Sequence, residues 1–268
     1  MSDPSTRSTI VRMSASGKIE TCPDHLAVEA PLEIRIGNEP FVVTMRTPGH
    51  DVELAAGFLV SEGIVTKPSD IRDITRCPAS STPENSLRVD LASGQPSGVV
   101  PSARHAAVDS SCGVCGVQSI ESVRKAFPAI DSDITMDRHC LLKLPETLRR
   151  NQAVFDRTGG LHSAGIFDLD GRLLVLREDI GRHNAVDKVI GHAFLHDLWP
   201  LDRHVLVVSG RVAFEIMQKA LAARIAIVAA VSAPSSLAVS FALDSGQTLV
   251  GFLRQPTFNI YSHPQRIA

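Results

Sequence analysis

The stretch SSCGVCG at residues 110–116 places two thiols, Cys112 and Cys115, two residues apart among small residues. A sulfur that attacks, or is attacked, needs access and thiolate character, and neighbouring amides, a helix start or cations can lower its pKa from about 8.5. The apolar spacing of residues 117–127 predicts a helix, so Cys115 is expected at or just before a helix N-terminus, where negative charge is favoured. Sulfur chemistry is therefore the leading interpretation of this stretch.

Four interpretations of the thiol pair compete. A tight turn with cysteines as small apolar fillers is disfavoured by the glycines on both sides of the second thiol. A structural zinc site normally takes four protein ligands, and the other cysteines, Cys22, Cys77 and Cys140, are isolated, so no metal site is expected. A dithiol redox centre should follow a strand in a βαβ unit, and the residues before the pair predict only a weak, short strand. A sulfur relay, in which one thiol carries a persulfide and the other assists or resolves it, has the same spacing as the redox centre.

The composition is that of a globular α/β protein. The chain has 268 residues, many of them aliphatic, with one Trp and one Tyr, which is enough for one large domain or two ordinary ones. A formal charge of −2 gives no overall basic field for nucleic acid. Five cysteines, an odd count, indicate free thiols rather than a disulfide scaffold. Because the sequence offers neither a signal-peptide core nor an apolar run of membrane-spanning length, we expect a cytoplasmic protein without membrane contact.

The first half of the chain predicts a small α+β roll. After a segment over 1–20 that is expected to be mobile, residues 21–100 predict two strands, a helix and two strands, at 32–36, 41–45, 51–62, 71–77 and 87–91. A connection over 101–140 then carries the thiol loop, and connections of this length are usually functional or mobile.

Residues 141–268 predict a three-layer domain in the order αββαβαβαβ. Its helices are expected at 145–156, 184–196, 213–223 and 235–244, and its strands at 161–168, 172–177, 205–208, 225–231 and 248–253. This topology is that of the cytidine deaminase fold, and the whole chain is expected to be α/β (α+β overall). The deaminase zinc ligands and acid are missing, because the relevant helices begin with His183-Asn184-Ala185 and with SGRVA at 209–213. The pocket of this scaffold is therefore expected to hold another ligand.

Three segments predict a rim for a phosphate-bearing anion. They contain His162, the pair Arg182 and His183, and the turn with Ser209 and Arg211. Helix starts and glycine turns bind phosphate through free amides, and arginines add bidentate pairing. The alternatives are solvated surface arginines and a structural histidine at position 162.

These segments resemble the FdhD-type formate dehydrogenase accessory sulfurtransferases. The matching stretches are 112–116, 158–165, 177–188, 209–214 and 259–261. The resemblance implies a homodimeric sulfur carrier with a deaminase-like fold. It further implies that sulfur is accepted from a cysteine desulfurase as a cysteine persulfide. That sulfur would pass to the molybdenum of bis(molybdopterin guanine dinucleotide) before this cofactor enters formate dehydrogenase.

The resemblance also implies residue roles. The persulfide cysteine falls on Cys112, with Cys115 as the second thiol, and the cofactor is expected as a transient ligand rather than a permanently bound group. The guanine-nucleotide contact falls, by position, on Gly251, Phe252, Leu253, Arg254, Gln255 and Pro256. The expected cofactor-binding set is completed by His162, Arg182, His183, Ser209 and Arg211. Two other classes stay open, a non-catalytic chaperone of the molybdenum cofactor and a dithiol oxidoreductase.

Overall fold

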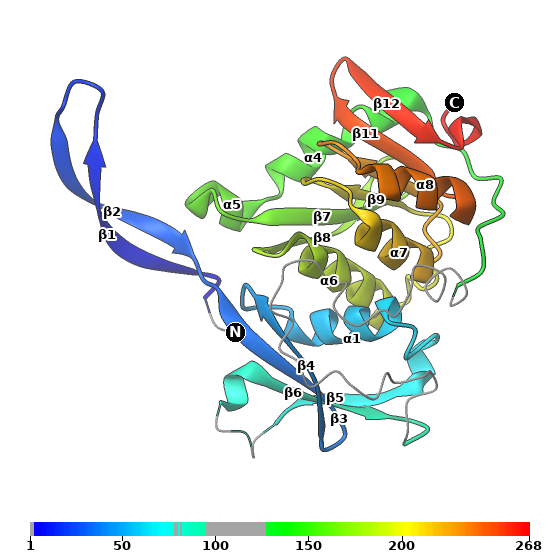
Figure 1. Ribbon diagram of the computed structural model, residues 1–268, viewed down its shortest axis with the longest axis horizontal. Helices are drawn as coiled ribbons and strands as arrows, with labels where there is room; N and C mark the ends of the chain where they lie inside the picture. The colour runs from blue at the N-terminus through cyan, green and yellow to red at the C-terminus, as the bar shows by residue number, and fades with distance from the viewer. Residues whose placement is uncertain (1–2, 78–79, 81, 95–126) are drawn as a thin grey trace.

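The computed structural model describes residues 3–77, 80, 82–94 and 127–268, and these form three β-sheets (Figure 1). Cys112 and Cys115, with all but the last residue of the helix predicted after them, lie outside the described residues. None of the described helices is long and apolar enough to cross a membrane.

A two-stranded ribbon projects from the body of the molecule (Figure 1). Its strands, β1 (Ser5–Met13) and β2 (Ile19–Ala27), pair antiparallel along their whole length. A mobile segment was expected over residues 1–20, and the ribbon stands in its place. The strand signal is weak in the sequence because the ribbon buries little apolar surface, and Val11, Met13 and Ile19 are 63–67 % exposed.

The next four strands form a small sheet that carries one helix. The strands β3 (Ala30–Ile36), β4 (Glu39–Arg46), β5 (Ile71–Arg76) and β6 (Ser86–Leu91) lie in the order β4-β3-β6-β5, and α1 (Asp51–Ser61) follows β4. This is the predicted ββαββ order. The central pair, β3 and β6, is parallel and buries Leu32, Ile34, Leu87 and Val89 completely. Short 3₁₀ helices, η1 (Pro68–Asp70) and η2 (Pro83–Asn85), flank β5.

The six-stranded sheet has the order β12-β11-β10-β9-β7-β8. Its strands are β7 (His162–Phe167), β8 (Leu173–Asp179), β9 (Val205–Val208), β10 (Ile227–Ala230), β11 (Thr248–Arg254) and β12 (Thr257–Ser262). The three strands β9, β10 and β11 are parallel, whereas β7 runs antiparallel to both of its neighbours and β12 runs antiparallel to β11.

Helices cover both faces of this sheet, as expected for a three-layer domain. On one side lie α6 (Arg182–Leu195), α7 (Phe214–Ala222) and α8 (Ser236–Ser245), and α4 (Leu144–Arg150) and α5 (Ala153–Thr158) lie on the other (Figure 1). A short helix, α3 (Arg138–Leu141), precedes α4, and η3 (Pro264–Arg266) ends the chain.

The structure differs from the predicted order in two places. The single helix expected over 145–156 is two helices, because the carboxylate of Glu178 accepts the backbone N–H groups of Val154 and Phe155 at 2.9 and 2.8 Å and so starts α5 separately. The strand expected last, at 248–253, is followed by β12 after a tight turn at Gln255-Pro256, a pair of residues that is more typical of loops.

Helices α1 and α6 join the two large sheets through direct backbone contact. A Cβ atom on Gly57 would lie 1.8 Å from the carbonyl oxygen of Asp187, and a Cβ on Gly191 would lie 1.8 Å from that of Glu53. Only glycine fits at either position. The buried apolar residues of both sheets form one continuous cluster around this helix pair, so the predicted units 21–100 and 141–268 share a core.

Candidate functional site

The site lies along the edge of the six-stranded sheet that is formed by the carboxyl ends of its parallel strands. The parallel strands β9, β10 and β11 end there, and β7 begins there because it runs antiparallel to β9. Ligands of open α/β sheets bind in the crevice outside the carboxyl ends of such strands. Two cavities open at this edge, and they meet at His162, which lines both.

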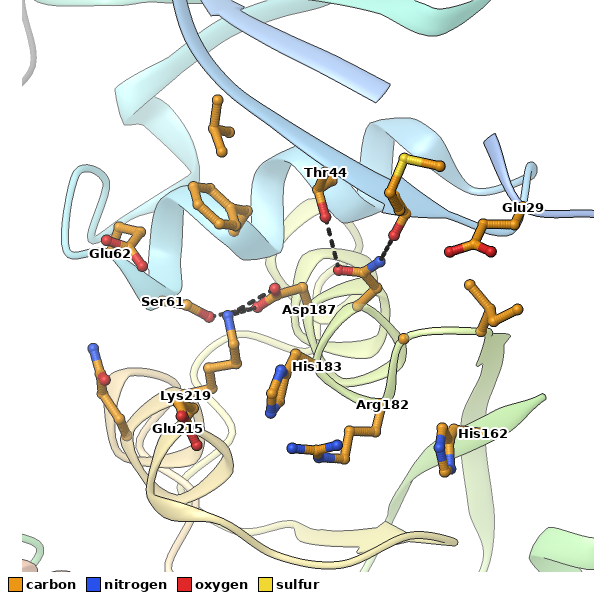
Figure 2. A pocket seen from close by; sticks show the side chains of 17 residues that line it. Glu29, Thr44, Ser61, Glu62, His162, Arg182, His183, Asp187, Glu215 and Lys219 are labelled. Carbon is orange, nitrogen blue, oxygen red and sulfur yellow. Dashed lines mark hydrogen bonds and ion pairs between the residues drawn. The ribbon is translucent and has the colours of Figure 1, made fainter. Parts of the chain in front are cut away.

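The first cavity has a volume of about 310 Å³ and lies between β4, the end of α1 and the starts of α6 and α7. Its polar lining includes His162, Arg182, His183, Glu215 and Lys219. Figure 2 shows Lys219 reaching toward Asp187 and Ser61, with Arg182 between His183 and His162. The cavity therefore combines cationic, anionic and imidazole groups from three elements, β7, α6 and α7.

One wall of the first cavity is a closed polar triad. The ammonium of Lys219 donates to both carboxylate oxygens of Asp187 at 2.8 and 2.7 Å, and the hydroxyl of Ser61 donates to Asp187 at 2.7 Å. Burial raises the pKa of Asp187, and the Lys219 ammonium opposes that rise. Because the three groups satisfy one another, this wall fixes the helices and leaves little capacity for a ligand.

Other groups in the first cavity have unused capacity. The Nε atom of Arg182 and the Oε2 atom of Glu215 are buried, and neither has a hydrogen-bond partner within the described part of the chain. Leaving a buried polar group unpaired costs about 1–3 kcal/mol, and more for a charged group. A ligand that supplies an acceptor to Arg182 and a donor to Glu215 would recover that cost.

His162 separates the two cavities as a neutral imidazole. Burial lowers its pKa, and the positive charges of Arg182 and Arg211 lower it further. The ring packs closely on the following turn, since a Cβ on Gly210 would lie 3.1 Å from its Nδ1 atom. A neutral His162 can donate through one ring nitrogen and accept through the other.

The second cavity is larger and less polar. It has a volume of about 830 Å³ and lies between α4, α5 and the ends of β9 and β11. Apolar side chains such as Leu148 and Phe155 line it together with Arg149, Ser209 and Arg254. Its shape and lining suit a flat or elongated ligand with few charges. Such a ligand would enter from the same edge of the sheet as a ligand of the first cavity.

The predicted cofactor residues divide into two groups. His162, Arg182 and His183 line the first cavity, and His162, Ser209, Arg254 and Gln255 line the second. Arg211 is exposed, close enough to His162 to act on its pKa.

The remaining predicted residues on β11 and its turn line neither cavity. Gly251 and Leu253 are buried, because alternation along the strand turns them inward. Gly251 packs against Pro234 and Tyr261, which leave no room for a Cβ. Phe252 is exposed, beneath the guanidinium of Arg254 at 6.0 Å, and Pro256 lies exposed in the hairpin turn.

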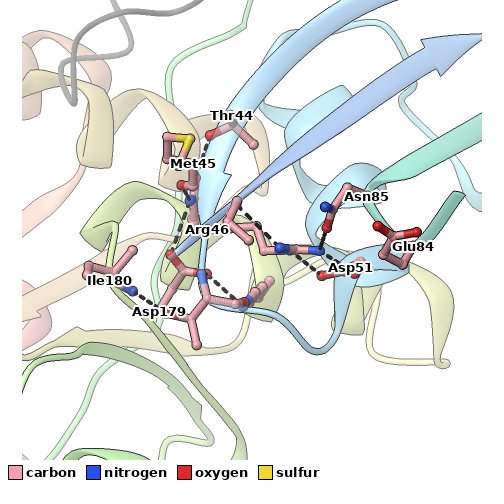
Figure 3. A network of polar contacts seen from close by, with 12 residues as sticks. Thr44, Met45, Arg46, Asp51, Glu84, Asn85, Asp179 and Ile180 are labelled. Carbon is pink, nitrogen blue, oxygen red and sulfur yellow. Dashed lines mark hydrogen bonds and ion pairs between the residues drawn. The ribbon is translucent and has the colours of Figure 1, made fainter. Parts of the chain in front are cut away.

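A buried polar network holds the start of α6, and with it Arg182 and His183 (Figure 3). Asp179 pairs with Lys188 at 2.7 Å and accepts the backbone N–H of Thr47 at 3.1 Å. The side-chain amide of Asn184 donates to Asp179 at 3.1 Å and to the carbonyl of Met45 at 2.7 Å. Burial raises the pKa of Asp179, while Lys188 and the hydrogen bonds oppose the rise.

A second part of the same network anchors the end of β4 (Figure 3). Arg46, which is 1 % exposed, donates to both oxygens of Asp51 at 2.9 and 3.2 Å and to Asn85 at 3.1 Å. Although burial disfavours the charge of Asp51, hydrogen bonds from Arg46 and Arg76 hold its pKa below the usual range. The site thus stands on a rigid base in which charges are paired.

Sequence reasoning missed Glu215 and Lys219 in the first cavity, together with the residues that β4 and α1 contribute. The helix over 213–223 was predicted, but its residues were not considered as ligands. A signal for Glu215 was available in the sequence. This acid lies in the first turn of the helix that follows β9 and its turn, and such a helix begins at the same edge of the sheet as the site.

The chain matches known proteins along most of its length. The model of the FdhD/NarQ family matches residues 27–268. The chain is 46 % identical over 269 residues to the sulfur carrier protein FdhD of Streptomyces coelicolor, covering 98 % of this chain and 95 % of the relative. It is 48 % identical over 266 residues to that of Mycobacterium tuberculosis, covering 96 % of each chain.

A solved structure is similar as well. The crystal structure of a formate dehydrogenase accessory protein from Desulfotalea psychrophila superposes with a TM-score of 0.80 at 25 % identity. The superposition covers 99 % of this chain and 100 % of that chain.

Proposed function

Because the chain belongs to the FdhD/NarQ family, we propose that it is a sulfur carrier that serves the maturation of formate dehydrogenase. It takes sulfur from a cysteine desulfurase as a persulfide on Cys112 and delivers it to the molybdenum of bis(molybdopterin guanine dinucleotide). Support comes from relatives that carry the name sulfur carrier protein and from the Cys-x-x-Cys spacing at Cys112 and Cys115. We further propose that it acts in the cytoplasm as a homodimer.

In the proposed sulfur transfer, one thiol accepts the sulfur and the second thiol releases it. The Cys112 thiolate attacks the outer sulfur of the donor's persulfide, so that a new S–S bond forms on Cys112 and the donor leaves as a thiolate. The Cys115 thiolate then attacks the Cys112 sulfur, which forms a disulfide and releases the outer sulfur as hydrosulfide with its electron pair. A cellular thiol reductant restores both cysteines for the next cycle.

The observation that carries the binding part of the proposal is the pair of cavities that meet at His162. The cargo has two nucleotide halves and several phosphates, and it is a transient ligand. In this proposal Arg182, whose Nε atom has no partner among the described residues, holds phosphate oxygens together with Arg211 and Arg254 at the rim, as guanidinium groups do through paired hydrogen bonds. The less polar second cavity accommodates a flat ring system.

Intact-protein mass spectrometry tests the sulfur step. The chain is incubated with a cysteine desulfurase and cysteine, and wild type is compared with Cys112→Ala and with Cys22→Ala as a matched control. We expect one added sulfur that reductant removes, present in wild type and in the control and absent in Cys112→Ala. No added sulfur in wild type would contradict the relay and leave the cofactor chaperone as the function to pursue.

A separate measurement tests the binding step. Titration calorimetry with guanosine diphosphate probes one half of the cargo, and we expect Arg182→Met to weaken binding about tenfold or more, the effect of losing a charged hydrogen bond of about 1.5–3 kcal/mol. Exposed Arg172→Met is the control. Unchanged affinity in Arg182→Met would exclude this cavity as the nucleotide site. Reduction of insulin disulfides at thioredoxin-like rates would instead favour the dithiol oxidoreductase.

A further inference from the structure

The end of the α1–α6 pair that lies away from the first cavity carries a cluster of three side chains, Glu53, His192 and His196. Each can offer one ligand atom, and these three atoms all lie within 4.8 Å of one another. His192 lies in the last turn of α6 and His196 directly follows the helix, and their rings stack with centroids 4.4 Å apart. Two imidazoles at this spacing can bind one metal ion together.

The protein orients both rings through the same nitrogen. The Nδ1 atom of His192 lies 3.0 Å from a carboxylate oxygen of Glu53, and the Nδ1 atom of His196 lies 2.9 Å from the backbone carbonyl of His192. A metal-binding histidine usually donates its other ring N–H to a carboxylate or a carbonyl in this way. Among the described residues neither Nε2 atom has a hydrogen-bond partner, so these two atoms remain for a metal ion.

The charges around the cluster leave the imidazoles available. Arg177 binds Glu53 through two hydrogen bonds of 2.5 and 2.7 Å and lies 3.1 Å from Nδ1 of His192, and His50 lies 3.4 Å from Glu53. The Arg177 guanidinium neutralises the Glu53 carboxylate. Glu53 therefore serves to orient His192, and the ion would be held mainly by nitrogen.

We propose that His192 and His196 bind one divalent first-row transition-metal ion through their Nε2 atoms, with Glu53 as the group that orients His192. Neutral imidazole favours ions such as nickel, copper and zinc over magnesium or calcium. His192 is partly buried and His196 is exposed, so the ion is reached directly from solvent. The site does not depend on the proposed sulfur transfer, since it shares no residue with either cavity.

Equilibrium dialysis against Ni²⁺, with the metal counted by mass spectrometry, tests the proposal on the full chain. Wild type is compared with His192→Ala/His196→Ala and with His25→Ala/His139→Ala, a control that removes two imidazoles elsewhere. Every variant keeps all five cysteines, so metal bound to thiols cancels in the comparison. We expect wild type and control to bind one Ni²⁺ more per chain than the double variant at the same free concentration.

Two further variants sharpen the result. His196→Ala alone changes an exposed side chain and is expected to lose the ion even if the double variant folds poorly. Glu53→Gln is expected to weaken Ni²⁺ binding about tenfold or more, the usual effect of removing an orienting carboxylate. Equal Ni²⁺ content in wild type and His196→Ala would overturn the site, and equal affinity in Glu53→Gln would overturn the role given to the carboxylate.

Discussion

The two ends of the α1–α6 helix pair carry charged clusters of different character. At one end Lys219, Asp187 and Ser61 are buried and satisfy one another. At the other end Glu53 is buried, Arg177 and His192 are partly buried, and His196 is exposed. Enclosed charges hold a fold in place, whereas partly exposed ones keep atoms free for a ligand. The difference predicts that substitutions at the two ends lower the free energy of unfolding by unequal amounts.

The backbone contact between α1 and α6, which lies between the two ends, should be the place where a substitution lowers stability most. Gly57→Ala places a methyl group 1.8 Å from a backbone oxygen of α6, which no rotamer change can relieve. We expect a loss of about 4–5 kcal/mol in the free energy of unfolding, or no folded protein. Urea denaturation measures this, with Gly160→Ala as a control whose methyl meets the Ala27 side chain at an ordinary 3.6 Å. A loss below about 1 kcal/mol would show that the helices can separate freely.

Breaking the ion pair at the enclosed end should cause the second-largest loss of stability. Lys219→Met leaves the buried carboxylate of Asp187 without its cation, and we expect a loss of about 3 kcal/mol. Burial then raises the pKa of Asp187 further, so the variant should regain part of its stability as the pH falls and the carboxylate protonates. Denaturation at two pH values checks both points. A loss that does not change with pH would show that Asp187 is not the source of the cost.

Breaking the ion pair between Arg177 and Glu53 at the open end should lower stability less. Arg177→Met removes two hydrogen bonds from Glu53, but Glu53 keeps its contacts with His50 and His192, so we expect a loss of about 1–2 kcal/mol. The comparison with Lys219→Met under identical conditions is the decisive measurement. Equal losses would contradict the distinction between an enclosed and an open end.

The smallest effect should come from His162, at the boundary between the cavities. Its pKa is lowered in the folded protein, so the unfolded chain binds a proton more readily. The stability that His162 contributes is therefore complete above about pH 6.5 and decreases as the pH falls below that value. His162→Asn should flatten this part of the pH profile by a fraction of a kcal/mol. An unchanged slope between pH 7 and pH 5 would mean that the ring titrates as it does in water.

The sequence allowed part of the site to be predicted, for physical reasons. His162, Arg182 and Ser209 were placed at strand ends, and strands that alternate with helices bring such ends to one edge. The stretch from Gly251 to Pro256 was placed by position alone, and strand alternation turns Gly251 and Leu253 inward. The role of Asp179 was not predictable, because its partner Thr47 lies 132 residues earlier in the chain. No local pattern records a contact of that kind.

The N-terminal ribbon has a practical consequence. One of its faces carries Val11, Met13 and Ile19 near the tip, and two strands without a third are only marginally stable in water. The match to the family model begins at residue 27, where the ribbon ends. A version that starts at Val28 would keep both larger sheets and remove the most exposed large apolar side chains of the described residues, which makes it the better choice for crystallisation and for spectroscopy at high concentration.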